Sequence, residues 1–184
     1  TPTAKPAAKQ AIDDALKAKN DAIDSNNDLT AEEKAKAKED AKAKADAAKQ
    51  AIDNATTNDA VTQAKNAGAT SVDSVTPTPV VKPAAKQAID DALKAKNDAI
   101  DSNNDLTAEE KAKAKEDAKA KADAAKQAID NATTNDAVTQ AKNAGATSVD
   151  SVTPTPVVKP AAKQAIDDAL KAKNDAIDAN NDLT

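Results

Sequence analysis

The chain has 184 residues and a net charge of −5, and it contains no His, Cys, Met or aromatic residue. The absence of Cys excludes disulfides, thiol chemistry and thiolate metal sites, and without His the usual neutral-pH base is lacking. All 26 basic residues are lysines interleaved with 31 acidic residues, so nucleic acids and anionic membranes are not expected as partners. No apolar run approaches the ~18 residues of a membrane span, and no membrane insertion is expected. No signal-peptide pattern occurs at Thr1, so we expect an internal fragment.

The sequence is built from repeats. Residues 6–82 and 83–159 are identical, and residues 160–184 begin a third copy with one substitution, Ala179 for Ser102. A fixed period of 77 residues indicates an array of repeated domains, each large enough for one modest core. Each repeat has only ten Ile, Leu and Val residues, which leaves disorder as an alternative. Helical periodicity argues against disorder.

The first helix is expected from Ala7 to about Ser25, after a lead-in over 1–5, with Pro6 in its first turn. Its apolar residues fall on one face at 100° per residue. They are Ala8, Ile12, Ala15, Leu16, Ala22 and Ile23. The asparagines at 26–27 interrupt this pattern and predict a left-handed end to the helix, because Asn tolerates that conformation better than other non-glycine residues.

The second helix is the longest element expected. It begins at the capping box Thr30-x-x-Glu33 and has no Gly, Pro or β-branched residue before Ile52, which predicts a rod of roughly 38 Å. A heptad-like seam follows 4-3-4-3 spacing and is almost wholly alanine, which allows close helix packing. The seam consists of Ala41, Ala45, Ala48, Ile52 and Ala55. Ion pairs between Glu32 and Lys36 and between Asp40 and Lys44 are expected on the outer face.

The third helix is expected from about Asp59 to Val75, and Thr56-x-x-Asp59 is the nearest pattern to a capping box at its start. Its apolar stripe contains a glycine. The stripe consists of Val61, Ala64, Gly68, Val72 and Val75. Gly68 therefore predicts the close approach of a neighbouring helix, with a break in the helix as the alternative.

Proline-rich segments separate the repeats and predict short, extended spacers. The expected fold is all-α: an elongated tandem array of three-helix bundles joined by short Pro-rich linkers. The expected parts are a first bundle over 6–75, a linker over 76–82, a second bundle over 83–152, a linker over 153–159 and the first helix of a third repeat over 160–184. Val80 and Val81 are candidates to dock on an adjacent helix.

Two bundle arrangements are compatible with the repeat. The favoured one combines helices one, two and three of the same repeat. In the alternative, helices two and three combine with helix one of the next repeat. Ile166, Leu170 and Ile177 would then pack against Val138 and Val149.

One segment imitates a metal site. Asp24-x-Asn26-x-Asp28 resembles the start of an EF-hand loop, but Leu29 occupies the glycine position and Ala35 the position of the bidentate Glu. A helix-end loop explains the same residues, so no metal site is expected. With no His or Cys and no glycine-rich phosphate loop, we expect no catalytic residues, no cofactor, no small-molecule substrate and no enzyme activity.

The phrases AKQAIDDALKAKNDAIDSNNDLTAEEK and AIDNATTNDAVTQAKNAGATSV resemble the Ala- and Lys-rich repeats of domain-of-unknown-function family 1542. The resemblance covers essentially the whole repeat. It implies a helical-bundle stalk in long, wall-anchored surface proteins of Gram-positive bacteria, which are often linked to adhesion or biofilm formation. It also implies an extracellular, cell-wall-attached location, and the family has no established catalytic residues. The junction TPTPVVKP departs from units that abut directly.

The expected function is a structural spacer that projects an adhesive domain from the cell wall as a monomer. The alternative is a weak multivalent module that contacts a host protein or the same array on another cell. Strong binding is not expected because the chain lacks Trp, Tyr and Arg, the residues enriched in interface hot spots. Linked modules can nevertheless gain avidity. A third alternative is a flexible, partly helical tether.

Overall fold

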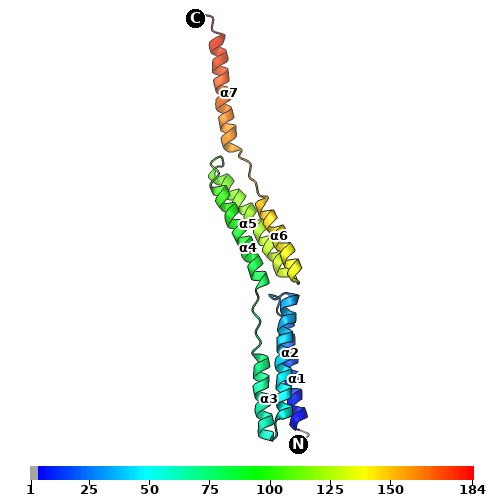
Figure 1. The fold of residues 1–184 in the computed structure, drawn as a ribbon. Helices are drawn as coiled ribbons and strands as arrows, with labels where there is room; N and C mark the ends of the chain where they lie inside the picture. The colour runs from blue at the N-terminus through cyan, green and yellow to red at the C-terminus, as the bar shows by residue number, and fades with distance from the viewer. Residues whose placement is uncertain (1–3) are drawn as a thin grey trace. The chain divides into compact units, whose positions relative to one another are not determined.

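The computed structural model describes residues 4–184, so residues 1–3 of the expected lead-in lie outside the described residues. The described residues form helices and no strands (Figure 1). The helices are α1 (Ala4–Asp24), α2 (Ala31–Asn54), α3 (Asn58–Asp73), α4 (Val81–Asp101), α5 (Ala108–Asn131), α6 (Asn135–Asp150) and α7 (Val158–Asp178). The chain divides into two compact units. The first contains the described residues up to Lys86 together with Gln127–Ala141, and the second contains Gln87–Lys126 and Lys142–Thr184.

Helix α1 begins at Ala4, three residues before the predicted start. Pro6 is tolerated there because the first turn of a helix does not use its backbone N–H groups. The predicted left-handed end is wrong, since no described non-glycine residue has a positive φ. Instead, the Asn26 N–H donates to the Ile23 carbonyl at 3.1 Å, and the Asn26 Oδ1 accepts the Asp28 N–H at 3.0 Å. This side-chain turn reverses the chain without the strained conformation. Of the predicted apolar face, Ala22 is exposed.

The capping box of α2 is confirmed. The Thr30 hydroxyl accepts the Glu33 N–H at 3.3 Å, and the Glu33 Oε1 accepts the Thr30 N–H at 2.9 Å. The predicted alanine seam is buried from Ala41 to Ile52, whereas Ala55 lies past the helix end and is half-buried. Ala37 extends the buried seam one turn toward the N-terminus.

The start of α3 differs from the prediction. Thr57 is the N-cap, with its hydroxyl accepting the Ala60 N–H at 3.0 Å, so the predicted capping role of Thr56 is wrong. The predicted close approach at Gly68 is confirmed. Gly68 is buried, and a Cβ added to it would overlap the Cβ of Ala48. The glycine therefore serves the packing of α3 against α2, and the helix continues through it.

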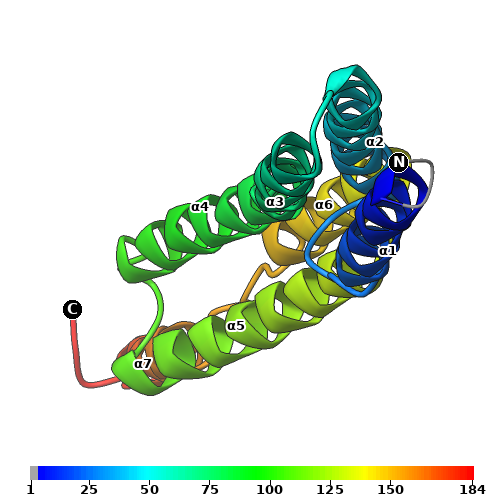
Figure 2. The same cartoon turned by 90° about the horizontal axis from the view of Figure 1, so that it is seen from below.

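Helices α1, α2 and α3 all contact one another, and Figures 1 and 2 show them side by side. Their core contains Ile12, Ile52 and Val72, which are fully buried. Ile23, Leu29 and Ala37 form a separate cluster at the end where α1 turns into α2. These contacts join the first, second and third helices of one repeat.

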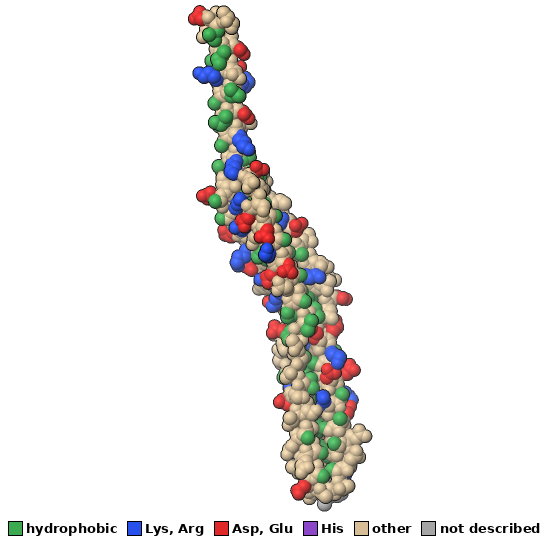
Figure 3. Space-filling model, turned by 60° about the vertical axis from the view of Figure 1, so that its left-hand side comes forward, with side chains coloured by type: hydrophobic (Ala, Val, Ile, Leu, Met, Phe, Trp, Pro, Cys, Tyr) green, Lys and Arg blue, Asp and Glu red, His purple; other side chains and the backbone are tan. Residues whose placement is uncertain are grey.

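The surface is charged, and acidic and basic side chains are interspersed on the face shown in Figure 3. The two ion pairs predicted on α2 are wrong. Asp40 pairs with Lys36 at 2.7 Å instead of with Lys44, and the Glu32 carboxylate accepts the Asn135 N–H at 2.8 Å. Interleaved charges offer each acid two lysine neighbours, so sequence spacing alone does not select the partner.

The second repeat buries the same positions as the first, including Ile89, Ile129 and Val149. Gly145 meets Ala125 as Gly68 meets Ala48. Helix α7 repeats the sequence of α4 but has no buried residue. Ile166 is 69% exposed, whereas its counterpart Ile89 is fully buried. The contrast shows that the helix alone does not cover its apolar stripe.

The proline-rich segment between α3 and α4 has no regular secondary structure through Val80. Helix α4 begins at Val81, two residues before the predicted bundle boundary at 83, again because its Pro83 lies within the first turn. Val80 is 62% exposed, so the prediction that it docks on a helix is wrong. Its backbone N–H instead donates to the Glu33 carboxylate.

Candidate functional site

The EF-hand-like residues belong to the turn between α1 and α2. The Asp24 carboxylate pairs with Lys38 at 2.9 Å, and the Asn26 Oδ1 is used by the Asp28 N–H. The Nζ of Lys34 donates to the Asp24 carbonyl at 2.8 Å and caps the end of α1. Within residues 4–184, no group of three or more metal-ligating side chains comes together. The polar atoms of this turn therefore close the helix ends.

Glu33 connects the start of α2 to the start of α4. Its Oε1 completes the capping box, and its Oε2 accepts the N–H groups of Val80 at 2.9 Å and Val81 at 3.3 Å. These are N–H groups at a helix start, which have no partner inside the helix. Burial pushes the pKa of Glu33 up, but the N–H groups of Thr30, Val80 and Val81 together hold it below its ordinary value.

The second repeat reproduces this arrangement at Glu110. Its Oε1 accepts the Thr107 N–H at 2.9 Å, and its Oε2 accepts the N–H groups of Val157 and Val158 at 2.9 and 3.3 Å. The hydrogen bonds from Thr107 and Val157 lower the pKa of the Glu110 carboxyl. One carboxylate in each repeat thus caps its own helix and the first helix of the following repeat.

A lysine at the start of each repeat has partners that change with its neighbours. The Nζ of Lys82 donates to the carbonyls of Asn27 and Asp130, both at 2.8 Å. The equivalent Lys5 donates to the Asp53 carbonyl at 2.7 Å, and Lys159 donates to the Asn104 carbonyl at 2.6 Å. Lys82 therefore combines the bond that Lys5 makes within its own repeat with the bond that Lys159 makes to the preceding one.

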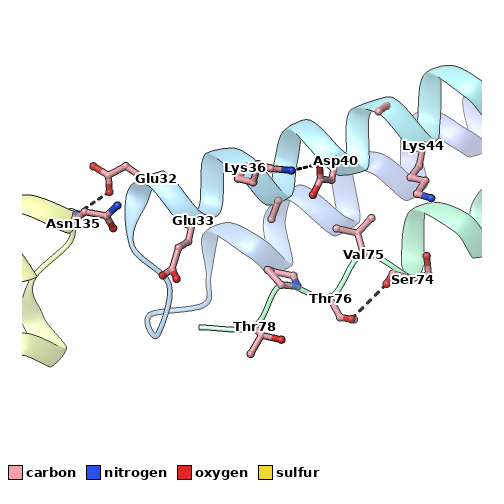
Figure 4. Close-up of a pocket in the computed structure, with 13 residues that line it drawn as sticks. Glu32, Glu33, Lys36, Asp40, Lys44, Ser74, Val75, Thr76, Thr78 and Asn135 are labelled. Atoms are coloured by element: carbon pink, nitrogen blue, oxygen red, sulfur yellow. Dashed lines mark hydrogen bonds and ion pairs between the residues drawn. The ribbon is translucent and has the colours of Figure 1, made fainter. Parts of the chain in front are cut away.

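The first unit contains two more hydrogen bonds that join the first repeat to the second. The Ala31 N–H donates to the Thr133 carbonyl at 2.7 Å, and the Glu32 Oε2 accepts the Asn135 N–H at 2.8 Å (Figure 4). Thr133 lies in the turn between α5 and α6, and Asn135 is the first residue of α6. The Ala31 N–H at the start of α2 is thus satisfied by the second repeat, and the Asn135 N–H at the start of α6 is satisfied by the first.

An open groove of about 760 Å³ runs between α2 and the proline-rich segment. Its walls include Lys36 and Asp40 on one side and Val75, Thr76 and Thr78 on the other (Figure 4). The corresponding groove of the second repeat is lined by the equivalent residues. The walls carry an ion pair, hydroxyls and small apolar groups. These groups do not form a pair of nucleophile and base, so the groove has the character of a contact surface.

Sequence comparison bears on this repeated architecture. Two tandem matches to the family model described as Domain of Unknown Function (DUF1542) cover residues 4–80 and 81–157. The chain belongs to this family.

The relatives of this DUF1542 chain are long surface proteins. It is 33% identical over 180 residues to "Extracellular matrix-binding protein ebh" of Staphylococcus aureus strain MRSA252, covering 98% of the chain and 2% of the relative. It is 34% identical over 183 residues to "Extracellular matrix-binding protein EbhA" of strain Newman, covering 100% of the chain and 5% of the relative. The chain therefore spans a small fraction of these relatives. No solved structure matches it.

These relationships place the DUF1542 repeats at the bacterial cell surface, in an extracellular setting. In the described part of the chain, no helix combines the length and apolar character needed to cross a membrane.

The capping-box pattern of the DUF1542 repeat predicts one role of Glu33, whereas its bond to the next helix was not predicted. The bridging role of Lys82 was not predicted either. One signal was available: VVKP at 80–83 replaces the TAKP at 3–6 of the first copy, so the lysine and proline are kept in both contexts. The carbonyl partners of the lysine leave no such signal, because every residue has a carbonyl.

Proposed function

We propose that these repeats act as a non-enzymatic spacer that holds another part of a bacterial surface protein away from the cell wall. The observation that carries the proposal is the direct bonding of consecutive repeats through Glu33 and Lys82. A 24-residue α2 helix is about 36 Å long, so each repeat would add a fixed rise. Copy number would then set the reach of the protein.

Family membership and composition support this proposal. The relatives are many times longer than the chain, and identical repeats provide length without new chemistry. The chain has no His, Cys or aromatic residue, which is consistent with a structural role without cofactor or small-molecule substrate. The bundle boundaries that go with this role are 6–75 and 83–152, with proline-rich segments over 76–82 and 153–159.

Small-angle X-ray scattering of the 184-residue chain tests the spacer. A compact globule of this length would have a radius of gyration of about 16 Å. We expect a clearly larger value, a monomeric mass and a pair-distance distribution with a long tail. A radius close to that of the globule would contradict the proposal.

The names of the relatives favour a second candidate, a weak multivalent module for extracellular matrix. Repeated charged faces would then contact a host protein, with affinity arising from linked copies. Surface plasmon resonance against immobilised matrix proteins distinguishes the two functions. Binding that strengthens with the number of repeats favours the module, and an inert chain favours the spacer. Self-association of the isolated chain, measured by sedimentation, would instead favour contact between arrays on neighbouring cells.

A further inference from the structure

Five hydrogen bonds connect the start of α2 and the turn before it to two places in the next repeat, the start of α4 and the connection from α5 to α6. They lie within the first compact unit. They are Lys82 to Asn27, Val80 and Val81 to Glu33, Ala31 to Thr133, and Asn135 to Glu32. We call these five bonds the junction. Four of them involve backbone N–H groups at the starts of helices, which cannot be satisfied inside their own helices.

Lys82 is the buried charged residue of the junction. It is 4% exposed, and the two backbone carbonyls of Asn27 and Asp130 receive its ammonium. A buried charge needs such partners because water no longer reaches it. Opening of the first repeat would remove the Asn27 carbonyl and leave Lys82 with one partner fewer. Opening of the second repeat would release α4, which contains Lys82, and would take the lysine away from Asn27.

We propose that the junction couples the stabilities of neighbouring repeats, so that each folded repeat protects the one beside it from opening. Lys82 is the bridging residue, and the partner of the α1–α2 turn is the following copy of the same repeat. Coupling of this kind makes an array resist local opening better than independent domains would. The inference goes beyond the proposed spacer function and does not depend on it, because a matrix-binding array would be coupled in the same way.

The chain lacks Cys, so a single buried cysteine can report the opening of one repeat by its rate of thiol labelling. Ala41 in α2 and Ala118 in α5 are equivalent and fully buried. Ala41→Cys reports the first repeat, and Ala118→Cys reports the second. This choice avoids a difficulty of peptide-based methods, in which identical repeats yield identical fragments.

The experiment uses the full 184-residue chain and opens the second repeat by Ile129→Ala, a change at a fully buried position. Labelling at Ala118→Cys should accelerate because the second repeat is destabilised directly. Labelling at Ala41→Cys should also accelerate, by about tenfold, because contacting groups in one network commonly show coupling of this size. Unchanged labelling at Ala41→Cys would overturn the proposal.

A second set of variants tests whether Lys82 carries the coupling between the repeats. With Lys82→Met, the acceleration that Ile129→Ala causes at Ala41→Cys should shrink from about tenfold to less than about threefold. Lys159→Met is the matched control, because it removes an equivalent lysine that bonds Asn104 and not the first repeat. It should leave the tenfold acceleration intact. An equal acceleration with Lys82→Met would show that this lysine is not the bridge.

Discussion

Gly68 of α3 lies so close to Ala48 of α2 that a Cβ on the glycine would overlap the Cβ of Ala48 and come within 3.0 Å of the Ile12 Cδ1. Gly68→Ala combined with Gly145→Ala should therefore destabilise both bundles. Overpacking costs about 1–3 kcal/mol per site, and over most of this range the cost exceeds the gain of about 1 kcal/mol from replacing glycine in a helix. Urea denaturation followed by circular dichroism measures the change.

Moving the methyl group from Ala48 to position 68 tests whether overlap between α2 and α3 causes the loss of stability. Ala48→Gly with Gly68→Ala, together with the same pair at Ala125 and Gly145, keeps one methyl at each contact. This variant should recover most of the lost stability because the overlap is removed. A variant that stays as unstable as the glycine replacements alone would show that the contact between α2 and α3 is not the reason.

The N-cap of α3 gives a second prediction. The sequence pattern predicts Thr56 as the capping residue, whereas the structure has Thr57 in that role. Thr57→Ala should destabilise the first repeat by about 1 kcal/mol, the usual cost of losing a side-chain cap. Thr56→Ala should have little effect, since the hydroxyl that receives the Ala60 N–H belongs to Thr57. Thermal unfolding of the two variants compares them directly. A larger loss with Thr56→Ala would favour the original capping-box prediction.

Much of the fold could be predicted because the helices are amphipathic and carry local signals. The Thr30–Glu33 capping box, the buried alanine seam and the role of Gly68 all depend on residues within one helix or on one stripe. The N-cap of α3 was missed because two threonines stand side by side, and backbone geometry selects between them. The outer ion pairs were missed because each acid has more than one lysine within reach.

The junction could not be predicted from the sequence for a different reason. Lys82 bonds two backbone carbonyls, and its partner Asn27 lies 55 residues away. No complementary side chain marks such a contact. The second role of Glu33 was hidden by its first, since one oxygen completes the capping box and the other receives Val80. Local rules account for one oxygen of this carboxylate, and only the packing of successive helices accounts for the other.

The alanine seam gives a third prediction. Ala45 and Ala48 are buried where α2 meets its neighbours, so Ala45→Leu with Ala48→Leu should destabilise the bundle by about 1–3 kcal/mol per site through overpacking. Ala43→Leu is the matched control at an exposed position of the same helix and should change stability by less than about 0.5 kcal/mol. Equal or greater stability of the double variant in urea would mean that the seam is loosely packed.

The carboxylates of Glu33 and Glu110 give a prediction of pH dependence. Both have a lowered pKa in the folded chain, with burial opposing the N–H hydrogen bonds at Glu33 and the Thr107 N–H as the main cause at Glu110. The unfolded chain therefore takes up protons first as the pH falls. The stabilisation is complete above the ordinary Glu pKa of about 4.3 and is lost as the pH falls through the lower folded value.

Replacing both residues by glutamine should lower stability near neutral pH and flatten its fall between about pH 6 and about pH 3. Glutamine keeps the shape of the side chain but has one acceptor oxygen, so it cannot receive both Thr30 and Val80 as Glu33 does. Glu39→Gln with Glu116→Gln changes the same number of charges at exposed positions of α2 and α5. Urea midpoints across this pH range should separate the two variants. Parallel curves would mean that the capping carboxylates contribute no more to acid unfolding than exposed ones.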